Sequence, residues 1–205
     1  MAHLDWERHC WQDGYRFVAG VDEAGRGALA GPIVAAAVVL PHNAALPDET
    51  HEINDSKQLS ARKREVLAEL VRSVALCWGV AFVDASVIDE LGISRSNRLA
   101  MERAVEQLTC RADIVLLDAL ICELSAPQIG LIDGDAISLS IAAASILAKT
   151  ERDKYMHHRH TIDGRYHFDR NVGYGTALHL GSLRKHGPSP IHRLTFRGVR
   201  AESAE

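Results

Sequence analysis

Short apolar runs and helically spaced apolar positions divide the chain into distinct elements. Four runs have the length and composition of buried strands, and they cover residues 17–21, 33–40, 75–83 and 113–117. Helical periodicity predicts three longer helices, which begin after Ser60, near Ile93 and at Ser138. Two strands followed by alternating helices and strands indicate an α/β fold with a sheet of mixed direction.

The length and the apolar content fit one domain. With 205 residues, 47% of them hydrophobic, the chain is long enough for a single well-packed core and short for two. No stretch approaches the roughly 18 uninterrupted apolar residues of a membrane span, and the first residues, with Asp5 and Glu7, do not resemble a secretory signal. We therefore expect a cytosolic protein.

Four cysteines are scattered along the chain without a C-x-x-C pair. They are Cys10, Cys77, Cys110 and Cys122. Such spacing is typical of small core or surface residues in a reduced compartment. We therefore expect neither a zinc site nor a disulfide.

The net charge of −4 hides an uneven distribution of charge along the chain. Residues 1–148 contain 12 Lys and Arg against 21 Asp and Glu, whereas residues 149–200 contain 11 against four. A basic segment attached to an acidic body suits a phosphate backbone, although an ordinary solvated helical face would have the same composition.

Two adjacent acids, Asp22 and Glu23, end the first apolar run and precede the bend Gly25-Arg26-Gly27. Glycines allow the backbone to approach a ligand closely. Burying a charge costs free energy unless the charge is paired or binds a metal, so the pattern suggests a site for a hard cation. The alternative is that both acids are solvated at a strand end.

Two more acids lie at element ends, Asp118 after the fourth strand and Asp135 before the helix at Ser138. Ligands of α/β folds gather at strand ends, and four carboxylates brought together need cations to stay ionised. Oxygen ligands select Mg²⁺ or Mn²⁺, and two such ions can hold the attacking and departing oxygens of a phosphoryl displacement.

The local geometry sets one condition on this site. Neighbours on a regular strand point to opposite faces, so Asp22 and Glu23 are expected to share a site only if the strand ends or bulges there. Asp135 is expected near the positive end of a helix, which favours its ionised form.

An ordered set of motifs resembles ribonuclease HII over roughly residues 17–197. In chain order the motifs are Gly20-Val21-Asp22-Glu23-Ala24-Gly25-Arg26-Gly27, Asp55-Ser56-Lys57, Leu116-Leu117-Asp118, Gly134-Asp135, the run from Ser140 to Lys149, Gly173-Tyr174-Gly175-Thr176 and His192-Arg193. Any single motif is weak evidence, whereas the ordered set is highly specific.

The resemblance implies an RNase H-like α/β fold, with a mixed sheet flanked by helices. It implies one catalytic domain over residues 1–205, with a core at about 17–160 and a substrate-binding helical segment at about 161–200. The implied activity is endonucleolytic hydrolysis of the RNA strand of RNA–DNA hybrids, and nicking 5′ to single ribonucleotides in duplex DNA. Products would carry a 3′-hydroxyl and a 5′-phosphate.

The resemblance also assigns roles to residues. The implied catalytic and metal-binding residues, holding two Mg²⁺ or Mn²⁺ ions, are Asp22, Glu23, Asp118 and Asp135. The implied substrate-binding residues are Gly25, Arg26 and Gly27, which read the 2′-hydroxyl, Tyr174, which stacks at the RNA-to-DNA junction, and Lys57 and Asn97, which contact phosphates. The 2′-hydroxyl is the group that distinguishes RNA from DNA at one position.

Other polar residues have simpler expected roles. Asp153, near the end of the third helix, is expected to form a surface ion pair rather than to bind metal. A two-ion mechanism needs no general base, so the histidines of the basic segment suit phosphate contact or solvent. They are His157, His158, His160 and His167.

Two positions depart from the family pattern, Ala28 in place of a usual proline and Ala177 in place of a common lysine. Arg26 between the loop glycines favours ribonuclease HII over ribonuclease HIII. A DNA-specific nuclease of RNase H-like fold and a non-catalytic nucleic-acid binder stay open as alternatives. We expect a monomer that binds RNA–DNA hybrids and ribonucleotide-containing duplex DNA.

Overall fold

The computed structural model describes residues 2–42, 46–53, 56 and 59–200. Among these residues, five strands form one sheet in the order β3-β2-β1-β4-β5. The strands are β1 (Val18–Ala24), β2 (Ile33–Val39), β3 (Cys77–Val83), β4 (Ile114–Asp118) and β5 (Gln128–Leu131). β1 pairs antiparallel with β2 and parallel with β4, so the sheet has mixed direction, as expected.

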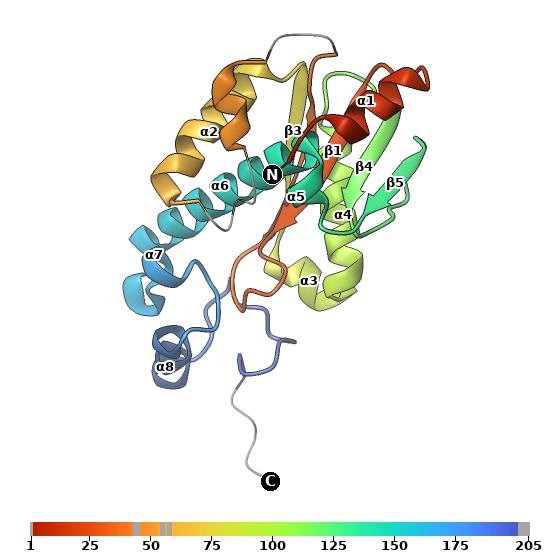
Figure 1. Cartoon of the computed structure of the whole chain (residues 1–205). Helices are drawn as coiled ribbons and strands as arrows, with labels where there is room; N and C mark the ends of the chain where they lie inside the picture. Colours follow the sequence, from red (N-terminus) through yellow and green to blue (C-terminus); the bar gives the residue numbers. More distant parts are fainter. Residues whose placement is uncertain (1, 43–45, 54–55, 57–58, 201–205) are drawn as a thin grey trace.

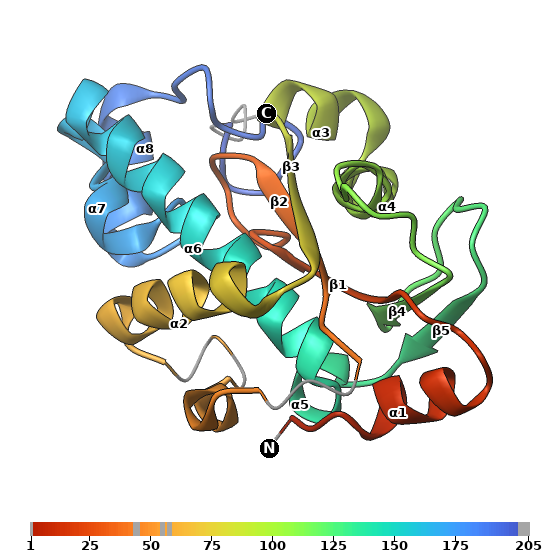
Figure 2. The same cartoon turned by 90° about the horizontal axis from the view of Figure 1, so that it is seen from above.

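Helices cover both faces of this sheet (Figures 1 and 2). The longer ones are α1 (Asp5–Gln12), α2 (Ala61–Val74), α3 (Ala85–Leu91), α4 (Ile93–Glu106), α6 (Leu139–Ile162) and α8 (Ala177–His186). The short ones are η1 (Asp48–Glu52), α5 (Gly134–Ile137), η2 (Gly164–Tyr166) and α7 (Phe168–Asn171). Figure 2 shows α6 and α2 on one side of the sheet and α4 and α3 on the other.

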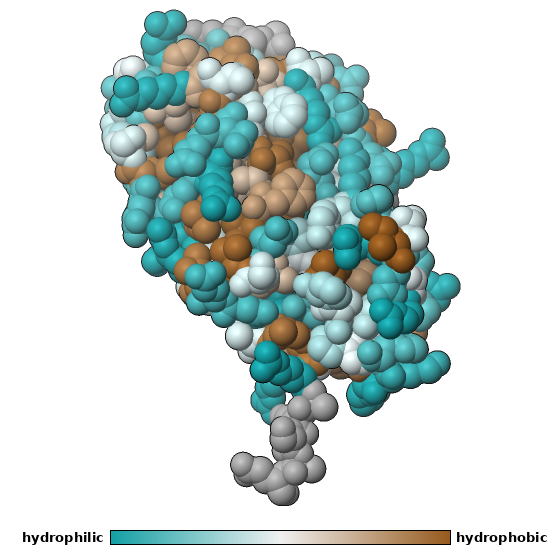
Figure 3. Space-filling view, turned by 180° about the vertical axis from the view of Figure 1, so that it is seen from behind, coloured by the Kyte–Doolittle hydropathy of each residue, from teal (hydrophilic) through white to brown (hydrophobic). Residues whose placement is uncertain are grey.

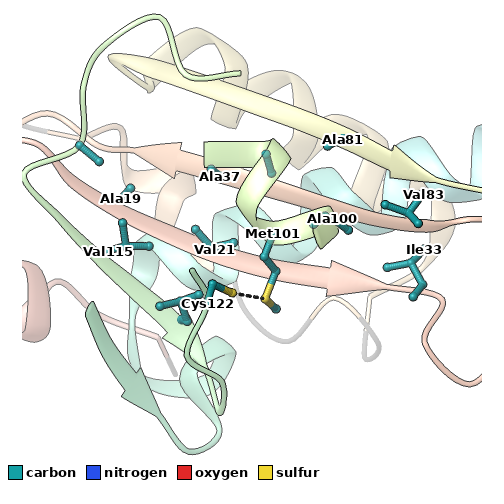
Figure 4. Close-up of a cluster of buried hydrophobic side chains, with 14 of the residues drawn as sticks. Ala19, Val21, Ile33, Ala37, Ala81, Val83, Ala100, Met101, Val115 and Cys122 are labelled. Carbon is teal, nitrogen blue, oxygen red and sulfur yellow. Dashed lines mark hydrogen bonds between the residues drawn. The ribbon is translucent and has the colours of Figure 1, made fainter. Parts of the chain in front are cut away.

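The inner strand β2 is buried along its whole length because helices pack on both of its faces. Ala35 and Ala37 face the α4 side, whereas Ala36 and Val38 face the side of α6. On the α4 side, Figure 4 shows Met101 of α4 beside Cys122, whose Sγ lies 3.9 Å from the methionine sulfur. This two-sided burial explains why the sequence of β2 is a continuous apolar run.

The long helix α6 packs very closely against β1. Ser138 caps it by accepting a hydrogen bond from the amide of Ile141, and the first turns are rich in alanine. A Cβ on Gly20 would lie only 2.2 Å from the backbone of Ser140, so glycine is required at this crossing. The close approach places Ser145 of α6 next to Asp22 of β1.

A small helical unit follows α6 and has its own core, built around Tyr166, Phe168 and Leu183. Figure 1 shows α7 and α8 at the end of the molecule where the loop after β1 also lies. The loop joins this unit directly, because the amide of Leu29 donates to the carbonyl of Gly173 (2.8 Å). The helical carboxy-terminal part was expected and is confirmed.

Most predicted elements are present, and the differences are local. Ser60 caps α2 through the amide of Lys63, as expected. The first strand is longer than predicted and extends through Ala24, so Asp22 and Glu23 lie within it. The pattern did not predict α3, a two-turn helix ended by Gly92, or the short strand β5.

The expectation that no cysteines pair is wrong. Cys77, at the start of β3, forms a disulfide with Cys110, in the segment before β4. The two residues are 33 positions apart, and α3 and α4 lie between them in the chain. Cys10 and Cys122 are free and buried.

One face of the molecule carries polar and apolar residues side by side. Figure 3 shows many hydrophilic residues on this face, with apolar patches between them. None of the helices in the described residues is long and apolar enough to cross a membrane.

Candidate active site

A cleft of about 650 Å³ opens at the carboxyl end of β1. Acidic, basic, aromatic and glycine residues from distant parts of the chain line it together. They are Asp22, Glu23, Ala24, Gly25, Arg26, Gly27, Ser56, Arg64, Asp118, Ser145, Lys149 and Tyr174. The structure thus brings together three of the four predicted acids, the glycine bend and the predicted aromatic residue.

Asp22 and Asp118 lie side by side because their strands are parallel neighbours. The last paired residues of β1 and β4 are Val21 and Leu117, and each acid comes one position later. In-register residues of a parallel pair project to the same face. Two carboxylates are therefore presented to the cleft from equivalent positions on adjacent strands.

Asp22 occupies the most enclosed position in the cleft and is only 5% exposed. Burial raises the pKa of its carboxyl well above the ordinary value, and the nearby charge of Glu23 raises it further. The hydroxyl of Ser145 and the amide of Glu23 (2.7 Å) donate to the carboxylate and partly oppose this effect. A cation bound here would offset the same cost.

The expected condition on Glu23, that β1 must end or bulge, is wrong. β1 stays in regular register with β2 through Ala24, with Asp22 opposite Ala36 and Glu23 opposite Ala35. Among the described residues, the other edge of β1 has no strand partner beyond Val21, because β4 ends at Asp118. The cleft lies at this open edge, so side chains from both faces of the strand line it.

Asp118 and Asp135 are connected through the start of α5. The carboxylate of Asp118 accepts a hydrogen bond from the amide of Gly134 (2.8 Å), which precedes Asp135. Asp135 lies in the first turn of α5, is 8% exposed and does not line the cleft. The structure therefore places this acid beside the cleft, not in it.

The donor set fits a hard divalent cation by its chemistry, since every acid offers carboxylate oxygens. Within the described parts of the chain, however, no three His, Cys, Asp or Glu side chains are grouped closely enough to form a ready-made metal centre.

Two buried arginines hold the loop after β1, residues 25–31, which we call the glycine loop. Arg193 donates from Nη2 to the carbonyl of Gly25 (2.8 Å), from Nη1 to that of Arg26 (2.9 Å) and from Nε to that of Gly31 (3.0 Å). Arg152 donates to the carbonyls of Ala30 (3.2 Å) and Pro32 (3.1 Å). Both arginines are 0% exposed, so the loop is fixed from its interior side.

The outer side of the glycine loop faces the cleft. Arg26 and Gly27 are exposed, and within the described residues their amide N–H groups have no hydrogen-bond acceptor. Gly25 has a φ of +91°, and a Cβ there would lie 1.9 Å from Nε of Arg152. Gly27 is different, because a Cβ there would meet no described residue within 4 Å.

Tyr174 lines the same cleft as the acids and is 36% exposed. The guanidinium of Arg152 lies 5.3 Å from the centre of its ring, and the ammonium of Lys149 lies 5.8 Å away. Its backbone is held at both polar atoms, since its amide donates to Asn171 (2.8 Å) and its carbonyl contacts Nδ1 of His179 (2.9 Å). The ring is therefore presented to the cleft from an anchored backbone.

Arg64 and Lys149 give the cleft positive charge, and Asp153 holds both of them. Its carboxylate accepts from Arg64 (3.1 Å) and from Lys149 (2.7 Å). The expected ion pair of Asp153 is confirmed, although the side chain is only 14% exposed and so is not at the open surface. Arg64 and the buried arginines were not assigned roles from sequence, because the carbonyls and charges they contact are distant in the chain.

The two predicted phosphate contacts, Lys57 and Asn97, stay predictions. Lys57 lies outside the described residues. Asn97 is 0% exposed on α4, a position that does not favour contact with a phosphate. Its two side-chain polar atoms have no hydrogen-bond partner within the described residues. Asn97 is buried because the helical phase of α4 turns this position toward the sheet.

Sequence comparison with known proteins gives a consistent result. The family model described as Ribonuclease HII matches residues 19–199. The chain is 47% identical to the ribonuclease HII of Halalkalibacterium halodurans over 98% of its own length and 75% of the relative's. It is 49% identical to the ribonuclease HII of Lactobacillus delbrueckii subsp. bulgaricus, covering 97% of this chain and 76% of the relative.

Solved structures with a similar fold agree with this result. Ribonuclease H2 from Pyrococcus horikoshii superposes with a TM-score of 0.75 at 25% identity, covering 89% of this chain and 95% of the other. The PCNA:RNase HII complex from Archaeoglobus fulgidus matches with a TM-score of 0.67 at 25% identity, covering 82% and 85%. Bst-RNase HIII in complex with Mn²⁺ has a TM-score of 0.72 at 18% identity, covering 96% and 72%. The chain belongs to the ribonuclease HII family and is an endoribonuclease that cleaves the RNA strand of RNA–DNA hybrids.

Proposed function

We propose that, besides cleaving hybrids, this enzyme nicks duplex DNA on the 5′ side of a single embedded ribonucleotide. The reaction is hydrolysis of a phosphodiester with two divalent ions, and it leaves a 3′-hydroxyl and a 5′-phosphate. One observation carries the proposal: the acids of β1 and β4 share a cleft with the glycine loop and Tyr174. The metal-binding acids and the residues that recognise the ribose can therefore act on the same nucleotide.

The ions are Mg²⁺ or Mn²⁺, held by Asp22, Glu23 and Asp118, with Asp135 joining from the start of α5. When bound, they would supply an activated water and neutralise the charge on the departing 3′-oxygen. Asp22 would help to hold both ions, because Glu23 follows it on β1 and Asp118 lies at the equivalent position on β4. Bst-RNase HIII, solved with Mn²⁺, supports the choice of a divalent ion.

The glycine loop reads the 2′-hydroxyl of the ribonucleotide through its backbone. The exposed amides of Arg26 and Gly27 are the available donors, and a hydroxyl oxygen can accept from them. Arg193 fixes the opposite side of the loop, so the donors are held in place before the substrate binds. A deoxyribose offers no oxygen at this position, which gives the selectivity for RNA.

Tyr174 stacks on the deoxyribose next to the ribonucleotide and recognises the junction. Its ring is apolar enough to pack against a sugar and is backed by the positive charges of Arg152 and Lys149. Arg64, Lys149 and the basic residues after position 149 would contact phosphates of the duplex. Residues 161–200 then serve as a substrate-binding segment of a single catalytic domain.

A cleavage assay on three duplexes tests this function. The substrates share one sequence and carry all DNA, one ribonucleotide, or RNA in one whole strand. We expect no cleavage of the all-DNA duplex, cleavage of the other two with Mg²⁺ or Mn²⁺, none after chelation with EDTA, and a mapped nick 5′ to the single ribonucleotide. Cleavage of all-DNA duplex would favour the DNA-specific nuclease, and binding without cleavage would favour the non-catalytic binder.

The enzyme is proposed to act as a monomer in the cytosol. The archaeal relative solved with PCNA makes a protein of that kind the first partner to test. Light scattering of the purified chain, alone and with such a protein, checks both the monomer and the association.

A further inference from the structure

Two buried histidines form a hydrogen-bonded chain behind Tyr174. Nε2 of His179, in α8, lies 2.9 Å from Nε2 of His192. At the other side of the pair, Nδ1 of His179 lies 2.9 Å from the carbonyl oxygen of Tyr174, and Nδ1 of His192 lies 2.9 Å from the amide of Ser189. The exposed fractions of His179 and His192 are 0% and 2%.

The partners at the two ends determine where the protons lie. The carbonyl of Tyr174 can only accept, so Nδ1 of His179 carries a hydrogen. The amide of Ser189 can only donate, so Nδ1 of His192 carries a lone pair. The contact between the rings is then a hydrogen bond donated by Nε2 of His192 to Nε2 of His179. Both rings are neutral in this arrangement, and each has one permitted tautomer.

The surroundings favour the neutral state. The rings of Tyr166 and Phe168, both fully buried, pack against the two imidazoles with centroid distances between 4.7 and 6.4 Å. Burial lowers the pKa of both histidines. Because aromatic rings enclose the pair, neither imidazole can rotate away from its partner.

The hydrogen bonds of the two histidines lead to the backbone of Tyr174. Tyr174 lies between Gly173, which has a φ of +87°, and Gly175. Its carbonyl accepts from Nδ1 of His179 and from the amide of Thr176 (2.8 Å), and its amide donates to the carbonyl of Asn171 (2.8 Å). Of these partners, His179 donates from a side chain that packs against the rings of Tyr166 and Phe168, so its hydrogen bond joins the Tyr174 backbone to the core of the helical unit.

We propose that His179 and His192 are positioning residues that set the preference of the enzyme for RNA–DNA junctions. The neutral pair fixes the backbone of Tyr174, and through it the place of the ring at the edge of the cleft. This inference rests on the proposed role of Tyr174 at the junction. It assigns the two histidines neither a contact with substrate nor a part in proton transfer.

Paired substitutions separate the two contacts of His179. Asparagine can place its amide nitrogen near the position of Nδ1, so His179→Asn keeps a donor for the carbonyl of Tyr174. Glutamine places its amide near Nε2, so His179→Gln keeps a contact with His192 and loses the one with Tyr174. The matched control is His9→Gln, because His9 makes a similar Nδ1 contact with a carbonyl, that of Asp5 (2.6 Å), on the exposed helix α1.

The readout is kcat/KM on the single-ribonucleotide duplex and on the uniform hybrid. Loss of one hydrogen bond that positions a recognition group is expected to lower cleavage at the single ribonucleotide about tenfold. We expect this for His179→Gln, with a much smaller change on the hybrid, while His179→Asn and His9→Gln stay near wild type. Equal losses on both substrates, or none, for His179→Gln would overturn the inference.

Tyr174→Ala serves as the reference in the same assay. If it lowers cleavage of both substrates equally, the proposed role of Tyr174 fails, and the inference fails with it. If it discriminates between them and His179→Gln does not, only the inference fails.

A second measurement uses the unmodified enzyme, so it does not require that any variant folds. Long-range ¹H–¹⁵N NMR spectra at neutral pH report the tautomer of each histidine. We expect the Nδ1–H form for His179 and the Nε2–H form for His192. The opposite tautomers, or a charged ring in either residue, would contradict the proton arrangement and overturn the inference.

Discussion

Nη2 of Arg193 donates a 2.8 Å hydrogen bond to the carbonyl oxygen of Gly25, although 168 residues separate the two in the chain. Arg193 also binds the carbonyls of Arg26 and Gly31, so one side chain holds both ends of the glycine loop. The carboxy-terminal segment thus holds a loop that lines the cleft. Its removal or distortion would alter the loop next to the acids.

Replacing Arg193 tests this support. Arg193→Lys keeps a positive charge but cannot donate to three carbonyls in the planar arrangement of a guanidinium. Leaving buried carbonyls unsatisfied costs about 1–3 kcal/mol each, so we expect a loss of at least about 2 kcal/mol in the free energy of unfolding. Cleavage of the single-ribonucleotide duplex should fall as well. Urea denaturation and the cleavage assay measure the two effects, with Arg197→Lys, an exposed neighbour, as the control.

The two glycines of the bend should respond differently to alanine. Gly25→Ala forces a Cβ into a left-handed backbone conformation and against Arg152, so we expect both stability and activity to fall. Gly27→Ala meets no neighbouring atom, so its thermal stability should stay near wild type. A loss of cleavage in Gly27→Ala without a loss of stability would locate the substrate beside this residue. Equal melting temperatures for the two variants would contradict the expected difference.

Removing the charge of Asp22 should separate binding from cleavage. Asp22→Asn keeps the shape of the side chain and removes the carboxylate that the metal ions need, so we expect cleavage to fall below detection. Hybrid binding, measured by fluorescence anisotropy, should be retained, because the positive side chains of the cleft are unchanged. Glu106→Gln, at an exposed position on α4, is the control. Full activity in Asp22→Asn would refute the proposed mechanism.

The buried histidine pair should make stability depend on pH. Burial lowers the pKa of His192 to about 4, and the neighbouring His179 adds to this effect, while the Ser189 backbone and Asp163 oppose it. The unfolded chain binds a proton near pH 6.5 that the folded chain does not, so folded-state stability falls as pH decreases from about 6.5 to 4. The full loss from this one group is about 3 kcal/mol.

A variant without the titrating ring isolates this effect. The stability advantage of wild type over His192→Gln, measured by denaturant unfolding, should shrink as the pH is lowered across that window. Parallel stability curves for the two proteins would show that His192 does not titrate as expected.

The disulfide between Cys77 and Cys110 can be counted directly. Denatured, unreduced protein should show two reactive thiols, those of Cys10 and Cys122, and four after reduction. Closing a loop of 33 residues is expected to stabilise the fold by about 3–4 kcal/mol in the chain-entropy model, so reduction should lower the melting temperature. Four reactive thiols before reduction would mean that the bond does not form in solution.

The sequence by itself determined most of the longer helices and strands and the order of the candidate site residues along them. Continuous apolar runs located the buried strands such as β2, and a serine capped α2 and α6 where helical spacing began, because these signals depend only on neighbouring residues. The same reasoning identified Asp22 and Asp118 at strand ends. Parallel pairing of β1 with β4 then places them side by side.

Only the tertiary structure decided which residues support and complete the cleft. The open edge of β1 beside Glu23, the burial of Asn97, the disulfide and the arginine and histidine contacts all join segments that are far apart in the chain. Such contacts depend on strand register and helix phase, and a shift of one residue would send each side chain to another face. Local sequence patterns do not predict register and phase, because these are set when the whole core packs.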